Sequence, residues 1–307
     1  MIITRQKLKD WMLPIAMLGG VVFYKWIHYL GFLSPILIFC MLTVTYCRIE
    51  PRAFRIGRFQ LVLLAVQLLL AFAVLGVLLP VDHVVATGLF ICVFVPTATA
   101  APVITGMLGG SIAHVATYSL LCNIVVAVVG PVVLAAVGDH PEMSFAESFS
   151  RICSSVMPLL ILPIITSLIL RYSLRHVHDG LARNQSLSFY MWALALFIVV
   201  GNSVSFIIRN FDPGHIVQIV ALALGSLVLC LAQFRLGRRV GHRYADRVTG
   251  GQCLGQKNTV LAVWLALTYL HPLASVGPAA YVAWHNSVNS WQLIRKHRAD
   301  ALHAASR

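Results

Sequence analysis

The chain is poor in charge, and above all in carboxylates at membrane depth. Only 11% of its 307 residues are charged, and ten are acidic. All ten lie outside the long apolar runs, at Asp10, Glu50, Asp82, Asp139, Glu142, Glu147, Asp179, Asp212, Asp246 and Asp300. Because no apolar run contains a carboxylate, the usual carboxylate-based ion coupling of transporters is disfavoured.

Clustered metal ligands and catalytic groupings are also missing. The seven cysteines are scattered without any CxxC spacing, which disfavours a disulfide framework and a zinc site. No serine has a histidine and a carboxylate suggested as partners by a motif. The sequence therefore predicts no enzyme activity, no metal and no cofactor.

What the chain has is hydrophobicity, at 59% of its residues. Apolar runs of a length that crosses a bilayer as a helix recur throughout, without a soluble domain. They predict an all-α polytopic membrane protein with ten spans, at about 11–30, 31–47, 60–80, 84–108, 111–137, 153–170, 187–208, 216–236, 253–270 and 273–294.

The basic residues are concentrated in alternate loops between these spans. Of the 23 lysines and arginines, 19 fall in loops on one side, and Lys25, Arg151 and Arg209 fall on the other. The positive-inside rule then places both termini in the cytoplasm and the chain in the inner membrane as a multi-pass protein. The net charge of +13 is thus an orientation signal in a lipid bilayer and not a nucleic-acid surface.

The remaining cation, Lys257, is the only charge inside a span, and such a charge usually marks a functional site. It follows glycines 250, 251 and 255, within the polar run 256–259. The span over 84–108 has a matching irregularity, between Pro96 and Pro102, because each proline interrupts a helix.

The ten spans divide into two sets of five, with an offset of about 156 residues that takes Pro102 to Asn258. Because each set has an odd number of spans, the second set enters the membrane from the opposite side. This predicts a five-plus-five inverted repeat with discontinuous helices in spans 4 and 9. Paired breaks of this kind point to a transporter binding site. The alternative is that the prolines and glycines only kink the helices.

At these residues the chain resembles the bile acid:sodium symporter family in its ten-span bacterial form. The resemblance is carried by Gly255-Gln-Lys-Asn-Thr259 and by Ala283-Trp-His-Asn286, with Gln67 at a sodium-site glutamine. It implies one transporter domain over 1–307. A panel would comprise about 11–47 and 153–208, and a core about 60–137 and 216–294, with spans 4 and 9 crossing at their breaks.

The resemblance further implies a secondary transporter that moves a bile-acid-like or smaller organic anion by alternating access. The candidate substrate and ion pathway consists of Gln67, Thr97, Thr99, Pro102, Ser119, Asn123, Gln256, Lys257, Asn258, Thr259, His285 and Asn286. Ser119 and Asn123 have the alternative of ordinary helix packing. For His285 and Asn286 the favoured alternative is hydrogen bonding between helices.

Several of the family's sodium ligands are replaced. Its span 9 glutamate aligns with Cys253, a neighbouring glutamine with Lys257, and a serine–asparagine pair with Ala101 and Pro102, so the sodium site is judged degenerate. Lys257 then has three interpretations. It is a fixed cation in place of sodium, a proton carrier that desolvation helps to deprotonate, or a lysine that snorkels to the interface.

Two other functions stay open on the same scaffold, a non-transporting receptor or structural protein and a passive facilitator. The sequence leaves the substrate, the coupling ion and the oligomeric state undetermined.

Overall fold

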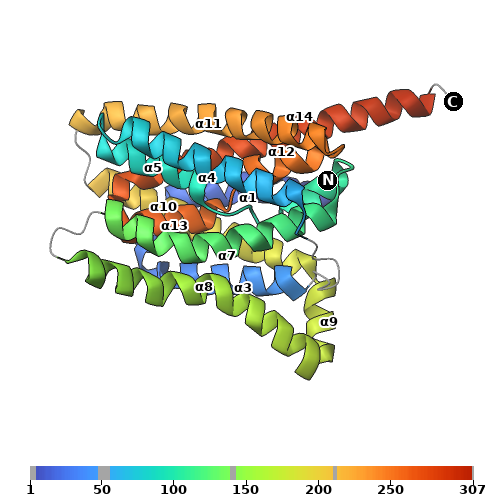
Figure 1. Ribbon diagram of the computed structural model, residues 1–307, viewed down its shortest axis with the longest axis horizontal. Helices are drawn as coiled ribbons and strands as arrows, with labels where there is room; N and C mark the ends of the chain where they lie inside the picture. Colours follow the sequence, from blue (N-terminus) through green and yellow to red (C-terminus); the bar gives the residue numbers. More distant parts are fainter. Residues whose placement is uncertain (1–4, 48–55, 139–142, 210–212, 306–307) are drawn as a thin grey trace.

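The structure is a computed structural model that describes residues 5–47, 56–138, 143–209 and 213–305. Every regular element in these ranges is a helix, and the only β-type pairing is an isolated backbone bridge between Thr97 and Lys257. Most of the helices run along the long axis of the molecule (Figure 1). The expectation of an all-α protein is confirmed for the described residues.

The elements follow one another in the order α1 (Arg5–Val22), α2 (Tyr24–Ile27), η1 (His28–Leu30), α3 (Leu33–Cys47), α4 (Arg58–Leu78), α5 (His83–Phe94), α6 (Ala101–Met107), α7 (Ile112–Val137), α8 (Phe145–Ser173), α9 (Arg175–Arg183), α10 (Gln185–Arg209), η3 (Pro213–His215), α11 (Ile216–Arg243), α12 (Arg247–Gly255), α13 (Thr259–Tyr269), η4 (Pro272–Ser275) and α14 (Val276–Ala305).

Several of these helices are apolar enough to cross a membrane. Four segments are both long enough and apolar enough to cross a membrane, namely Arg58–Leu78, Ile112–Val137, Phe145–Ser173 and Pro213–Arg243. Shorter apolar helices cover Leu33–Cys47, His83–Phe94, Tyr190–Phe206 and Thr259–Tyr269. The chain is therefore an all-α protein with the helices of a multi-pass membrane protein.

Some predicted boundaries were wrong. The span expected over 11–30 is interrupted after Val22 and continues as the short α2 and η1. The helices α11 and α14 run past the predicted limits, and α9 occupies a region where no helix was expected. The start of α1, α9 and the end of α14 all lie toward the right-hand side of Figure 1, which brings basic segments to one end of the molecule.

The helices pack in two groups. In one group α1 packs against α10, and α3 packs against α8 and α10. In the other, α11 packs against α5, α12 and α14, while α7 contacts α4, α6 and α12. The neighbouring helices α7 and α8 join the groups along one edge.

Glycines allow α11 and α12 to approach closely. A Cβ on Gly250 would overlap the carbonyl oxygen of Gly237 and lie 2.9 Å from Gly241 Cα. Small residues at helix interfaces of membrane proteins serve this kind of packing. The glycines at 250, 251 and 255 therefore belong to the regular helix α12 and do not form the break expected there.

The break between α12 and α13 is confined to residues 256–258. On the other side, α5 ends at Phe94 because Pro96 follows. Its C-cap residue Val95 is extended, with φ −57° and ψ 152°, as the residue before a proline prefers. Pro102 lies in the first turn of α6 and not in the break, since a helix tolerates proline there.

Candidate functional site

The two helix breaks lie against each other. The Ala98 amide donates to Gln256 O at 3.0 Å, and the Asn258 amide donates to Pro96 O at 2.9 Å. These bonds form a short antiparallel pair centred on Thr97 and Lys257. They also satisfy backbone groups that a broken helix would otherwise leave unpaired.

The Lys257 side chain is enclosed at this crossing. The residue is 1% exposed, and its Nζ donates to the Val95 carbonyl oxygen at 3.2 Å. Since Val95 caps the C-terminal end of α5, the ammonium lies where the helix dipole favours a cation. The side chain does not snorkel to the interface.

The ionisable groups around Lys257 are the thiols of Cys92, Cys122 and Cys253. Within the described residues no carboxylate acts on this ammonium. Lys257 is thus a buried amine without a carboxylate partner among the described residues. An anion that reached it would meet no competing carboxylate.

Gln67 on α4 contacts the same end of α5. Its Nε2 donates to Phe94 O at 2.9 Å and to Val95 O at 3.3 Å, which satisfies carbonyls at the end of α5. Its Oε1 accepts the hydroxyl of Tyr118 at 2.6 Å. The glutamine therefore shares the Val95 carbonyl with Lys257, and its amide oxygen is already used.

Side-chain hydroxyl groups also donate hydrogen bonds to carbonyl oxygens at the C-terminal end of α12. The Thr97 hydroxyl donates to Cys253 O at 2.8 Å, and the Tyr281 hydroxyl donates to Gly255 O at 2.8 Å. Ser119 adds a long bond of 3.5 Å to Thr97 O. Each of these bonds ties one side of the crossing to another helix.

Several polar side-chain atoms at the start of α13 lack hydrogen-bond partners in the part of the chain that the structure describes. Asn258 caps this helix, because its Oδ1 accepts the Leu261 amide at 3.2 Å. Its Nδ2, the Oε1 of Gln256 and the Oγ1 of Thr259 are buried without a hydrogen-bond partner among the described residues. Buried polar groups of this kind are uncommon and are suited to a ligand.

Not all predicted site residues join this arrangement. Asn123 bonds to Ser119 O and Asn286 to Val282 O, in each case on its own helix. Neither ring nitrogen of His285 has a partner among the described residues, and the ring packs edge-on against Tyr281. The expected interhelical hydrogen bonds of His285 and Asn286 are therefore absent there. Thr99 is half-buried beyond the bridge and forms none of the bonds described here.

Sequence reasoning missed several contributors to the site, among them the Tyr281 hydroxyl, which bonds to Gly255 O. The Val95 carbonyl is a backbone group, and Cys92, Cys122 and Tyr118 are ordinary core residues by type. The Cys122 sulfur accepts from Gln67 Nε2 at 3.1 Å. No pattern in the sequence marks these groups, because their role depends on contacts between helices.

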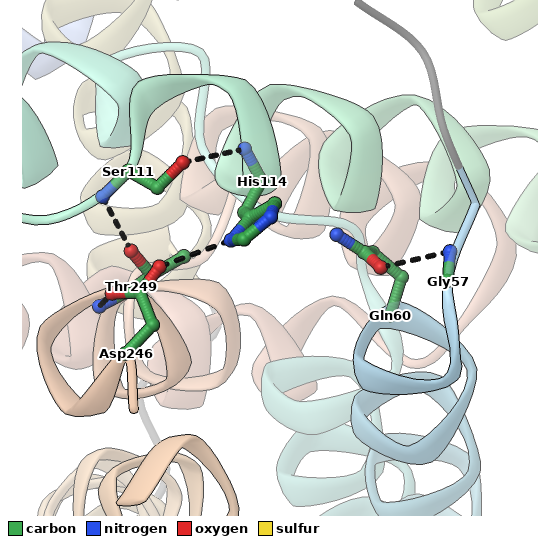
Figure 2. Close-up of polar contacts among 6 residues, drawn as sticks. All are labelled: Gly57, Gln60, Ser111, His114, Asp246 and Thr249. Atoms are coloured by element: carbon green, nitrogen blue, oxygen red, sulfur yellow. Dashed lines mark hydrogen bonds and ion pairs between the residues drawn. The ribbon is translucent and has the colours of Figure 1, made fainter. Parts of the chain in front are cut away.

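A second polar cluster ties the core together near the start of α7 (Figure 2). His114 Nδ1 lies 3.1 Å from Asp246 Oδ2 between α11 and α12, and the Ser111 amide donates to Thr249 Oγ1 at 2.8 Å. Asp246 also caps α12 by accepting the Thr249 amide at 3.2 Å. This cluster joins the start of α7 to the start of α12, although the two helices are distant in the sequence.

The sequence profile of the SBF-like CPA transporter family matches residues 31–284. The chain belongs to this family. The match runs from α3 into α14 and includes both helix breaks, Gln67 and Lys257. It bears out the resemblance to the bile acid:sodium symporter family and indicates a secondary transporter. No curated protein sequence matches the chain significantly.

Proposed function

We propose that the protein is a secondary transporter of a small organic anion that works by alternating access without the sodium sites of its relatives. The observation that carries this proposal is the buried ammonium of Lys257, held against the Val95 carbonyl where two broken helices cross. Transporters place their substrate and ion sites at such breaks. In this chain the cation at the break is part of the protein.

The arrangement supports a five-plus-five inverted repeat. The first set would run from α1 to α7 and the second from α8 to α14, with α5–α6 and α12–α13 as the equivalent broken spans. The antiparallel bridge between Thr97 and Lys257 pairs the two breaks nearly symmetrically. This symmetry is what an axis in the membrane plane would produce.

The two packing groups support the division into panel and core. The helices α1, α3, α8 and α10 would form the panel, while the broken helices with α4, α7, α11 and α14 would form the core. Two backbone hydrogen bonds across the crossing hold the broken helices of the core together. Substrate would then bind between the two units, beside the crossing.

The charge at the site favours an anion. An ammonium has three N–H donors, and the described contacts of Lys257 use one of them, on Val95 O. The unpartnered Nδ2 of Asn258 is a further donor at the N-terminus of α13, where the helix dipole also attracts negative charge. A carboxylate or sulfonate would accept hydrogen bonds from both the ammonium and the Asn258 amide.

The same geometry disfavours sodium. The carboxylate of the relatives is replaced by Cys253, and the Gln67 oxygen is engaged by Tyr118. A sodium ion about 4 Å from the ammonium would be repelled by about 4 kcal/mol at an effective dielectric constant of 20. Lys257 therefore takes the place of the ion and repels a mobile one.

The first test is uptake by proteoliposomes that contain the purified protein, with the substrate identified by untargeted analysis of the metabolites taken up. Uptake is expected to persist when potassium replaces sodium at fixed pH and membrane potential. Empty liposomes provide the control for passive entry. Loss of uptake without sodium would overturn the proposed sodium independence.

The second test concerns topology. We expect both termini on the cytoplasmic side of the inner membrane, because 19 of the 23 lysines and arginines lie on that side of the proposed spans. A reporter fused after Arg183 or Arg243 should be cytoplasmic, and one fused after Glu142 or Asp212 should be external. One reversed position among these four would invalidate the ten-span arrangement and the inverted repeat.

A further inference from the structure

A pocket lined by arginines lies between α11, α12 and α14, separate from the crossing. It has a volume of about 790 Å³. Its polar lining comprises five arginines together with His242 and Gln292, the arginines being Arg235, Arg238, Arg239, Arg243 and Arg247. Such a density of one charge in a concave surface calls for an anionic ligand.

No carboxylate pairs with these arginines in the part of the chain that the structure describes. The ion pairs identified there, His114–Asp246 and His178–Asp179, include none of the pocket arginines. Arg238 instead interacts electrostatically with Arg247 and Arg295. Like charges held together destabilise the fold unless an anion binds between them.

Packing fixes one of these guanidinium groups in position. The Arg238 side chain passes closely over Gly251 of α12, where an added Cβ would lie 2.8 Å from Arg238 Cγ. Its side chain is therefore packed against α12, and the residue lines the pocket. A charge that served only as an orientation signal would not require this placement.

The other wall of the pocket is apolar. It is formed by Leu231 and Phe234 of α11 with Val288 and Trp291 of α14, and the Arg295 guanidinium lies 4.9 Å from the centre of the Trp291 ring. The pocket thus combines a surface for hydrocarbon with a cluster of cations. Phosphate recognition by arginine together with apolar contact is the chemistry of a phospholipid headgroup and its chains.

The apolar wall continues along the surface of α11. Leu224, Val228 and Leu231 are exposed by 55%, 65% and 51% and follow one another at spacings that place them on one helical face. The same face reaches Arg235 one turn later. An exposed apolar stripe that ends at guanidinium groups is the surface that a lipid in the adjoining leaflet would meet.

We propose that this pocket binds an anionic phospholipid. The phosphate would be held by Arg235, Arg239 and the arginines beside them, and an acyl chain would lie along Leu224, Val228 and Leu231. A soluble phosphate compound would share the arginine contacts but would leave the stripe unused. The site is distinct from the crossing around Lys257 and does not depend on the transported substrate.

Quenching of Trp291 fluorescence provides the test, with the full-length protein in vesicles that contain phospholipids with brominated acyl chains. The Trp291→Phe variant isolates this residue among the six tryptophans. Brominated phosphatidylglycerol should quench Trp291 at lower mole fraction than brominated phosphatidylcholine. Since a basic residue near the surface contributes about fivefold in affinity for anionic lipid, Arg235→Gln with Arg239→Gln should weaken this preference roughly 25-fold.

The matched control is Arg175→Gln with Arg183→Gln on α9, which removes two cations outside the pocket and should leave the quenching preference unchanged. Equal quenching by both lipids, or an equal loss in the α9 variant, would overturn the site. Inorganic phosphate and glycerol phosphate test for a soluble ligand. If either abolishes quenching by brominated phosphatidylglycerol, the pocket binds free phosphate compounds and the lipid assignment is wrong.

Discussion

Replacing Lys257 by methionine is expected to lower anion uptake by roughly 10- to 100-fold, because a hydrogen bond to a charged group contributes about 1.5–3 kcal/mol. Thermal stability should stay the same or rise, since the substitution removes a buried cation that lacks a counter-ion. Initial uptake rates and thermal unfolding of the purified protein measure the two effects. Unchanged uptake in the methionine variant would show that the ammonium has no role in transport.

A pair of variants tests whether Lys257 takes the place of a sodium ion or whether transport only needs a positive charge at this position. Lys257→Gln combined with Cys253→Glu restores the two residue types that the related symporters carry at these positions. We expect sodium to stimulate uptake by this double variant more than uptake by the wild type, although Ala101 and Pro102 still lack the ligands of span 4. Cys253→Glu alone, with Lys257 retained, is the matched control and should remain independent of sodium because an ion pair would occupy the site. Sodium dependence in the single variant would contradict the displacement of sodium by Lys257.

Gly237→Ala is expected to reduce thermal stability strongly, although it adds a single methyl group. That methyl would overlap Gly250 O and approach Gly251 Cα to 3.0 Å, so α11 and α12 would have to separate. Overpacking of this kind typically costs about 1–3 kcal/mol. The midpoint of thermal unfolding in detergent provides the measurement.

The control is the same substitution at Gly76, within α4, where an added Cβ has no neighbour within 4 Å. Alanine is favoured over glycine inside a helix by about 1 kcal/mol, so Gly76→Ala should raise the midpoint slightly. Opposite signs for the two variants would identify backbone contact as the cause. A Gly237→Ala protein as stable as the wild type would exclude the close packing of α11 on α12.

The helix break after α5 was predictable because a local rule governs it. Pro96 restricts Val95 to an extended conformation and removes a backbone donor, whatever surrounds it. The isolated lysine in an apolar run was equally visible, since the cost of a charge at membrane depth does not depend on the details of packing.

Features that depend on distant contacts were not predictable. The glycines before Lys257 form part of a regular helix because α11 lies against them, and nothing near them in sequence indicates this neighbour. The partners of Gln67 lie 27 to 55 residues away, so its own sequence context does not reveal whether its oxygen is free. Helix α9 was missed because its polar composition lacks the long apolar run by which the other helices were identified.

The covalent attachment of the cation affects the energetics of the whole transport cycle. A sodium ion that travels with an anion balances its charge and adds the energy of the sodium gradient. A lysine returns with the empty carrier and supplies neither. Each monovalent anion would then carry net charge across the bilayer, and a potential that is negative inside would drive it outward by about 2.3 kcal/mol per 100 mV. In the proposed sodium-independent cycle, Lys257 would therefore favour export of the anion, or import only down a steep concentration gradient.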